Sequence, residues 1–272
     1  MGLFATLIGS ALLPAADDDQ RPIMIPGGVA DPAGRVGYLS NPKGGLVAID
    51  LEKGDVLWES KDANRPLAVI GKRLAALVPD QGASHVVRVI ILDSEAKGKK
   101  LAESAEIKLP EWAVVGTGLD HHRTGKAFNA QARLAKGDLL LCWWASTRYF
   151  GGAAPTREIE AAAAKEASGI ARIHVESGKV EALPGAERRE MTSGFSEAAK
   201  LPQAVQAVAQ REMWQGGAVV GPRAFGQIQK SKRTPGAFGD VLISVIQAVD
   251  LKTGKILWER AFEEQRMLPP PP

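Results

Sequence analysis

The sequence predicts an all-β fold built from repeated sheets of four short antiparallel strands, and three observations lead to this prediction. The stretch Ala48–Glu59 returns as Ala248–Glu259, with seven of the twelve positions identical. Between these copies lie many short apolar runs, each bounded by residues that favour turns. The 29 glycines and 17 prolines of the chain suit a fold with a large number of such turns.

The repeated stretch itself predicts a β-hairpin. Asp50 and Asp250 each end one strand, where a carboxylate can accept hydrogen bonds from the backbone of the turn. Gly54 and Gly254 supply the positive φ that a tight turn requires. The return strand then begins with large apolar residues, which favour a pleated and half-buried surface. It includes Trp58 in the first copy and Trp258 in the second.

Four units of this kind can be placed along the chain, over about residues 28–60, 67–109, 128–183 and 217–262. The second unit keeps the turn aspartate and glycine as Asp93 and Gly98, and the third keeps only Gly178. Radial repetition of four-stranded sheets is the β-propeller arrangement. The predicted fold is therefore a β-propeller of about four four-stranded antiparallel blades, or five if the irregular stretches contain another, with short helical insertions.

The ends of the chain and two internal stretches do not follow the repeat. The first residues form an apolar run that ends in small residues before Asp17, as in a secretory signal, so export to the periplasm, cell surface or medium is expected. Beyond it, no stretch approaches the roughly 18 apolar residues that span a bilayer. The expected segments are a signal peptide at 1–16, a linker at 17–27, a propeller domain at 28–266 with helical insertions at 153–167 and 186–213, and a Pro-rich tail at 267–272.

Composition excludes several classes of function. A net charge of +3 is too small to predict binding to nucleic acid. The single cysteine, Cys142, cannot form an internal disulfide and is expected in the core. Asp120-His121-His122 is interpreted as a solvated loop, because neighbouring side chains diverge and a metal site needs further ligands from elsewhere. No catalytic residue or metal ligand is predicted, and Trp143 and Trp144 are expected to face opposite ways.

The hairpin motif resembles the repeat of pyrroloquinoline quinone (PQQ)-like β-propellers. This resemblance implies that Trp58 and Trp258 dock between neighbouring blades, beneath the preceding turn. The family's enzymes are quinoprotein dehydrogenases, many of which hold PQQ against a disulfide between adjacent cysteines, beside calcium and a catalytic Asp. Other members are non-catalytic scaffolds that bind protein partners. With Cys142 alone that disulfide is absent, and no segment aligns with the calcium ligands or the catalytic Asp.

These considerations favour a non-enzymatic, exported scaffold with a protein partner, no cofactor, and contact elements in the insertions at 153–167 and 186–213. Deletion of 186–213 is expected to leave the fold intact. One alternative is a diverged quinoprotein oxidoreductase that binds PQQ and calcium on the propeller axis. Another is a half-propeller that forms a homodimer.

Overall fold

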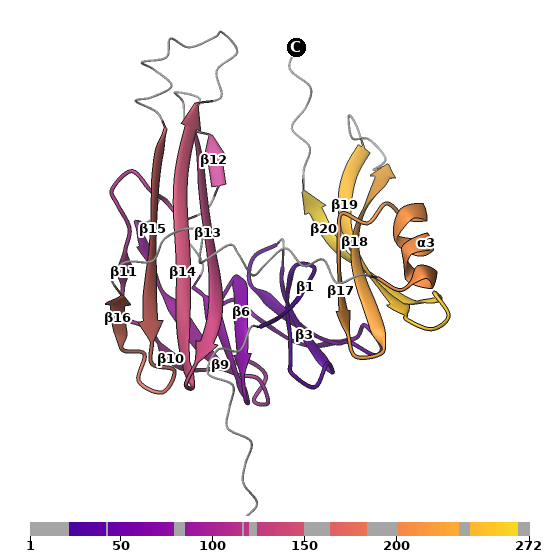
Figure 1. Cartoon of the computed structure of the whole chain (residues 1–272), viewed down its shortest axis with the longest axis horizontal. Helices are drawn as coiled ribbons and strands as arrows, with labels where there is room; N and C mark the ends of the chain where they lie inside the picture. Colours follow the sequence, from indigo (N-terminus) through magenta and orange to yellow (C-terminus); the bar gives the residue numbers. More distant parts are fainter. Residues whose placement is uncertain are drawn as a thin grey trace, which may run out of the picture.

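The computed structural model describes residues 22–41, 43–78, 85–115, 117–119, 124–149, 164–183, 201–233 and 240–265. The described residues form an all-β architecture of five antiparallel sheets with one helix (Figure 1). This confirms the predicted fold class. The expected signal peptide, the tail at 267–272 and Asp120-His121-His122 lie outside the described residues.

Each of the four predicted units forms one sheet of four or five strands, which we number I to IV. Sheet I contains β1 (Ile23–Ile25), β2 (Gly28–Ala30), β3 (Val36–Ser40), β4 (Leu46–Asp50) and β5 (Val56–Ser60). Sheet II contains β6 (Arg65–Ile70), β7 (Arg73–Leu77), β9 (Val89–Asp93) and β10 (Lys99–Glu103). Sheet III contains β12 (Thr117–Leu119), β13 (Thr124–Ala135), β14 (Asp138–Tyr149), β15 (Lys165–Ile173) and β16 (Val180–Leu183). Sheet IV contains β17 (Gly216–Val220), β18 (Arg223–Arg233), β19 (Asp240–Asp250) and β20 (Ile256–Gln265).

Two smaller elements complete the described structure. The strands β8 (Val86–Val87) and β11 (Ile107–Lys108) form a two-stranded ribbon beside sheet II. The helix α3 (Gln203–Arg211) precedes sheet IV in the chain.

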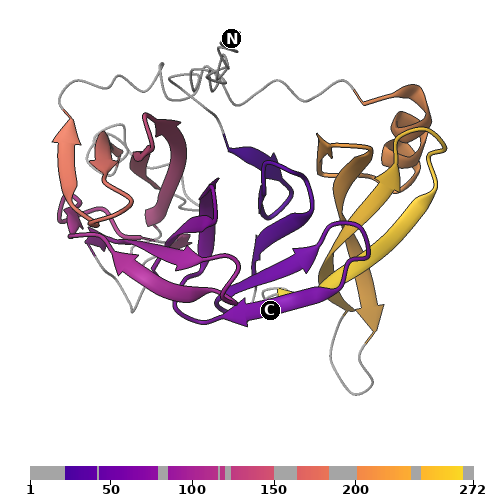
Figure 2. The ribbon, with the colours of Figure 1, turned by 90° about the horizontal axis from the view of Figure 1, so that it is seen from below.

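The four sheets lie along an arc whose order differs from their order in the chain (Figure 2). Sheet IV packs against sheet I, sheet I against sheet II, and sheet II against sheet III. Among the described residues, no buried apolar cluster joins sheet III to sheet IV, and these two sheets stand at opposite ends of the arc. The number of blades in a closed ring therefore stays a prediction.

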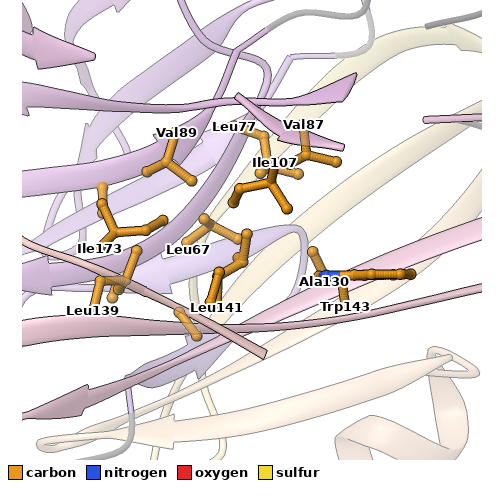
Figure 3. Packing of buried hydrophobic residues seen from close by; sticks show 14 of the residues in the cluster. Leu67, Leu77, Val87, Val89, Ile107, Ala130, Leu139, Leu141, Trp143 and Ile173 are labelled. Atoms are coloured by element: carbon orange, nitrogen blue, oxygen red, sulfur yellow. The ribbon is translucent and has the colours of Figure 1, made fainter. Parts of the chain in front are cut away.

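Each inner junction of the arc is a layer of apolar side chains from two facing sheets. Sheets I and II share Val29, Tyr38, Leu46, Ala48, Trp58, Val69, Leu74, Ala76, Ile90 and Leu92. The layer between sheets II and III is the largest and includes Leu67, Leu77, Val89, Leu139, Leu141, Trp143 and Ile173 (Figure 3). A sheet buried on both faces needs apolar residues at consecutive positions. This is why β9 is an unbroken run, Val89-Ile90-Ile91-Leu92, of which every residue is buried.

The structure corrects the predicted boundary between linker and first sheet. Residues 23–25, which the sequence places in the linker at 17–27, form β1 and pair with β2. Gly27, with φ of +78°, closes the tight turn between the two strands. Ile25 is buried in the layer between sheets I and IV, so its apolar burial holds the short strand in place.

The predicted insertions have different outcomes. Much of the insertion at 153–167 lies outside the described residues, but Lys165, Glu166 and Ala167 belong to β15 and not to a helix. They pair with the long strand β14, and this ladder overrides the helix propensity of the local sequence. In the insertion at 186–213, the helix expected after Pro202 is present as α3.

The turn glycines give a direct test of how the sheets are joined. A Cβ at Gly98 would lie 2.6 Å from Cζ3 of Trp58, and Gly98 has φ of +73°. We expect Gly98→Ala to lower the free energy of unfolding by about 3 kcal/mol, from left-handed strain of roughly 1–2 kcal/mol and overpacking of roughly 1–3 kcal/mol. Urea unfolding measures the loss.

Gly137 provides the matched control, because it has φ of +84° and a Cβ added there would meet no atom within 4 Å. Gly137→Ala should show the left-handed strain alone. In a Trp58→Ala background, the cost of Gly98→Ala should fall to that of Gly137→Ala. Equal costs for Gly98→Ala in the two backgrounds would show that the ring contact does not matter.

Candidate functional site

The turn aspartates act as predicted. Oδ1 of Asp50 accepts hydrogen bonds from the backbone N–H groups of Glu52 and Lys53, at 2.7 and 3.0 Å. Asp93 and Asp250 bind their own turns in the same way. The bonds from the backbone and side chain of Thr253 hold the pKa of Asp250 below its usual range. In sheet III the equivalent position is His174, which keeps the backbone bond from Gly178 N–H to its own carbonyl.

Two tryptophans dock on the turn glycine of the next sheet in the arc. Trp58 of sheet I lies against Gly98 of sheet II, and Trp258 of sheet IV lies against Gly54 of sheet I. Nε1 of Trp258 also donates a 3.2 Å hydrogen bond to the carbonyl of Leu51. The resemblance implied docking beneath the preceding turn. In the structure the turn belongs instead to the following sheet of the arc, because each tryptophan points out of its own sheet into the next junction.

The third junction uses the same glycine without a tryptophan. Four residues after the turn glycine, sheets I and IV carry Trp58 and Trp258, whereas sheet II carries the partly buried Ala102. The backbone of sheet II can then approach Gly178 directly, and a Cβ there would overlap the carbonyl oxygen of Glu103. The N–H of Ala105 donates to the Gly178 carbonyl at 3.1 Å.

At the end of the arc, α3 occupies the place of a neighbouring sheet. A Cβ at Gly254, the turn glycine of sheet IV, would lie 2.8 Å from the carbonyl oxygen of Ala204 in the helix. Val205 and Val208 of α3 are buried against Ala224 and Val249 of sheet IV. The helix therefore covers the face of sheet IV that a further blade would cover.

This packing corrects the expected result of deleting 186–213. Removal of α3 would expose the apolar face formed by Ala224 and Val249, which Val205 and Val208 bury at present. Burial of each such side chain is worth roughly 1.5–3 kcal/mol. The deletion would thus destabilise sheet IV. Substitutions on the outward side of the helix are therefore a better test of whether this segment binds a partner.

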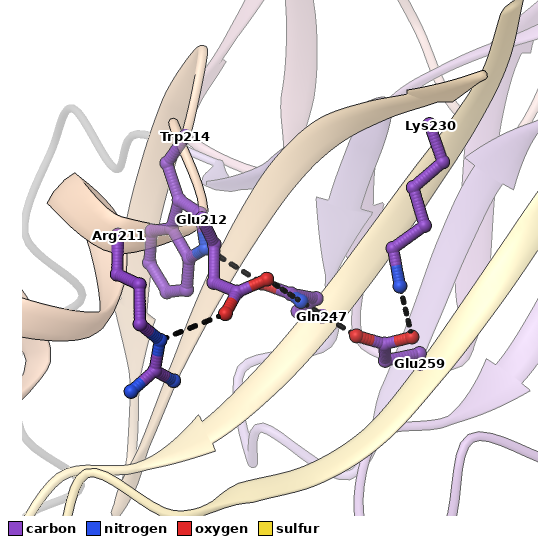
Figure 4. Close-up of polar contacts among 6 residues, drawn as sticks. All are labelled: Arg211, Glu212, Trp214, Lys230, Gln247 and Glu259. Carbon is purple, nitrogen blue, oxygen red and sulfur yellow. Dashed lines mark hydrogen bonds and ion pairs between the residues drawn. The ribbon is translucent and has the colours of Figure 1, made fainter.

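A buried polar network fixes the end of the helix to sheet IV (Figure 4). Trp214 lies flat over Gly217 and Gly226, where a Cβ at Gly226 would overlap its ring. Its Nε1 donates to Oε1 of Gln247 at 2.8 Å, and Gln247 is fully buried. Nε2 of Gln247 in turn donates to Oε1 of Glu259 at 2.6 Å and to Oε2 of Glu212 at 3.4 Å.

Charged groups close both ends of this network. Nζ of Lys230 lies 2.6 Å from Oε2 of Glu259, and Nε of Arg211 lies 3.0 Å from Oε1 of Glu212. The hydrogen bond from Lys230, followed by that from Gln247, lowers the pKa of Glu259. The amide of Gln247 is thus satisfied at both its oxygen and its nitrogen, as a buried polar group requires.

The opposite side of α3 faces solvent. Gln203, Ala207, Gln210 and Arg211 are exposed on the helix. Met213 follows the helix with φ of +54° and is 77% exposed, the highest exposure among the large apolar side chains described. The helix is held on its inner side and presents an outward surface that we define as Gln203, Ala207, Gln210, Arg211 and Met213.

The structure places the nine motif residues of the sequence prediction at the four turns and their return strands. The aspartates bind their own turns, while the glycines and tryptophans join neighbouring sheets or, at Gly254, contact α3. Trp143 and Trp144 face opposite sides of sheet III, with Trp143 in the core and Trp144 half-buried. Cys142 is buried and not in a disulfide, as expected. In the described part of the chain, no group of three or more His, Cys, Asp or Glu side chains could hold a metal ion. No helix there is long and apolar enough to cross a membrane.

Sequence reasoning missed the network around Trp214 and Gln247. One signal was available, since Gln247 interrupts the apolar run from Val245 to Val249. A polar residue within a buried strand indicates a polar partner above that strand.

No family model and no curated protein matches the sequence. Several solved structures are similar to the structure of this chain. BamB from Moraxella catarrhalis is 17% identical over 85% of this chain and 62% of its own, with a TM-score of 0.28.

Two dehydrogenases are also similar. The quinohemoprotein alcohol dehydrogenase ADHIIG from Pseudomonas putida HK5 is 14% identical over 90% of this chain and 43% of its own, with a TM-score of 0.31. A europium-containing methanol dehydrogenase is 11% identical over 84% of this chain and 60% of its own, with a TM-score of 0.25. This chain spans less than two thirds of the length of each of the three proteins.

The network yields a prediction for Trp214. Trp214→Phe keeps a ring over the glycines but removes the donor to Oε1 of Gln247, which is buried. A buried acceptor without its donor costs about 1–3 kcal/mol. We therefore expect the free energy of unfolding, measured with urea, to fall by that amount. In a Gln247→Leu background the same substitution should cost less than about 1 kcal/mol, because no acceptor is left unpaired. Equal costs in the two backgrounds would contradict the assigned hydrogen bond.

A second prediction concerns acid. The folded-state pKa of Glu259 lies below its usual value of about 4.3, so its stabilising contribution is present above that pH and is lost as pH falls through the folded pKa. Lys230→Met should remove part of this loss. Both side chains are more than a third accessible to solvent, so this ion pair contributes under about 1 kcal/mol to the free energy of unfolding.

The measurement compares urea unfolding at pH 7 with unfolding at pH 3. The fall in stability should be smaller for Lys230→Met than for the unmodified protein. Lys72→Met, which removes the more exposed pair with Glu95, is the control and should change the fall less. A larger effect of the control variant would show that Lys230 does not stabilise the charged form of Glu259.

Proposed function

We propose that the chain is an exported, non-enzymatic scaffold that binds a protein partner through the outward surface of α3. One observation carries this proposal. The helix occupies the place of a neighbouring sheet, is fixed there by Val205, Val208 and the Gln247 network, and leaves Met213 almost fully exposed. A solvent-facing methionine beside a fixed helix is an adaptable apolar contact on a rigid support.

The rigidity of this surface supports a binding role. A contact element that is ordered before binding loses less conformational entropy when a partner docks. Buried side chains hold α3 on one side, and the Trp214–Gln247 bond holds the residues that follow the helix. The outward surface combines amide groups with an arginine and a methionine, residue types that serve in protein interfaces. The scaffold needs no cofactor.

The test first identifies a partner and then asks whether α3 binds it. Proteins retained by the immobilised full chain are identified by mass spectrometry, and each is purified and titrated by calorimetry. We expect a combined Met213→Asn and Gln210→Ala variant to weaken binding of the partner at least tenfold. Asn tolerates the positive φ of residue 213, so the backbone should be retained.

Leu101→Asn is the matched control. Leu101 is an exposed apolar side chain on β10, remote from α3 in the arc, and its replacement should leave binding unchanged. Unchanged affinity of the α3 variant would place the contact elsewhere. Turnover of an alcohol with PQQ, calcium and an artificial electron acceptor would overturn the non-enzymatic role.

A further inference from the structure

Arg65 is a partly buried cation with a neutral partner. It begins β6, the strand of sheet II that contacts β2, β3 and β13, and so lies where sheets I, II and III meet (Figure 1). Its Nη2 donates a 2.6 Å hydrogen bond to Oδ1 of Asn129 on β13. Burial lowers the pKa of the guanidinium. Among the described residues, no carboxylate lies within ion-pair distance of Arg65.

Other arginines of the same sheets have carboxylate partners. Arg73 pairs with Glu176 across the junction of sheets II and III, at 2.9 Å. Arg88 pairs with Glu103 within sheet II. Both side chains are more than a third exposed, so they need a counter-charge less than the more deeply buried Arg65 does. A desolvated cation without an anion is costly, and native proteins rarely retain one without a purpose.

Two amide oxygens close in the sequence to Arg65 and Asn129 accept no hydrogen bond in the described structure. Oδ1 of Asn64, the preceding residue, is buried and accepts no hydrogen bond in the described structure. The same holds for Oε1 of Gln131, which is two residues after Asn129 and therefore on the same face of β13. The strand β12 pairs with β13 only as far as Ala127, so beyond that point β13 is the edge of its sheet.

From this arrangement we propose that Arg65 and Asn129 form a binding site for a carboxylate at the junction of sheets II and III. The planar guanidinium has Nε and Nη1 free to donate to two carboxylate oxygens, which is the geometry that arginine recognises best. The free edge of β13 suits a carboxylate that carries N–H groups beside it. A small organic acid and the carboxyl terminus of a polypeptide share this chemistry. The site is independent of the proposed function, because α3 contributes nothing to it.

The test uses the full chain and two kinds of probe. Succinate represents a small acid, and the peptide acetyl-Gly-Gly-Ala, with a free or an amidated carboxyl terminus, represents a polypeptide end. Binding is measured by calorimetry and by the shift in thermal unfolding temperature. We expect saturable binding of at least one free carboxylate and no binding of the amidated peptide. Succinate alone would indicate a small acid, and the free peptide alone a polypeptide end.

Arg65→Met should abolish binding, and Arg65→Lys should weaken it at least tenfold, because a lysine cannot bind both oxygens in one plane. Arg73→Met, which removes a paired arginine at the same junction, should leave it unchanged. Without ligand, Arg65→Met should unfold at or above the temperature of the unmodified protein, since it removes an uncompensated charge.

Three outcomes would overturn the proposal. One is equal binding by Arg65→Met. Another is the absence of binding for every free carboxylate. In the third, Arg65→Met and Asp80→Asn each lower the unfolding temperature by the same amount, and the double variant lowers it no further. Asp80 follows Leu77, the residue that pairs with Arg65, by three positions, so this result would identify a counter-charge within the chain.

Discussion

The arc of sheets depends on one contact, a close approach to the glycine of each Asp-to-Gly turn. Trp258 meets Gly54, Trp58 meets Gly98, and the backbone at Glu103 meets Gly178. The positive φ of each glycine turns the chain, and its missing side chain leaves the space that the next sheet fills. One residue type thus serves the hairpin and the junction at once. The separate sheets, each too thin to form a core alone, become a continuous structure because every junction buries two apolar faces.

The junctions between sheets are equivalent in position, but different groups cover the turn glycine in each. This difference shows what a contact with the turn glycine requires. Where a tryptophan is present, an aromatic ring separates the sheets, and the ring of Trp258 also donates a hydrogen bond to the turn. Where Ala102 replaces it, the backbone itself closes the gap and the ion pair Arg73–Glu176 crosses the junction. At Gly254 the contact comes from α3, so a helix packs on sheet IV at the position where a sheet packs in the other junctions. A junction of this kind demands only a well-packed surface over the glycine, and a helix meets that demand.

Sequence reasoning found the elements that are local and missed those that depend on distant partners. The turn motif, the four units and the helix after Pro202 follow from residues close together in the chain. The pairing of Trp258 with a turn some 200 residues earlier does not, because the arc places sheet IV beside sheet I and not beside sheet III. Lys165 and Glu166 have helix propensity, yet the length of β14 decides their conformation. The contact of α3 with Gly254 and the packing of Trp214 on Gly217 and Gly226 likewise depend on the assembled sheet IV, so the sequence alone does not predict them.

Two polar groups, the fully buried Gln247 and the partly buried Arg65, differ in how completely the protein satisfies them. Gln247 receives a hydrogen bond at its oxygen, donates from its nitrogen, and lies between charged groups that are themselves paired. Such a network stabilises one arrangement of α3 and has no capacity left for a ligand. Arg65 has one neutral partner, Asn129, and no carboxylate partner among the described residues. A chain that satisfies a buried amide so fully would gain stability by replacing an unsatisfied arginine with an apolar residue. The carboxylate that we propose would give Arg65, at the junction of three sheets, the partner that the described residues do not supply.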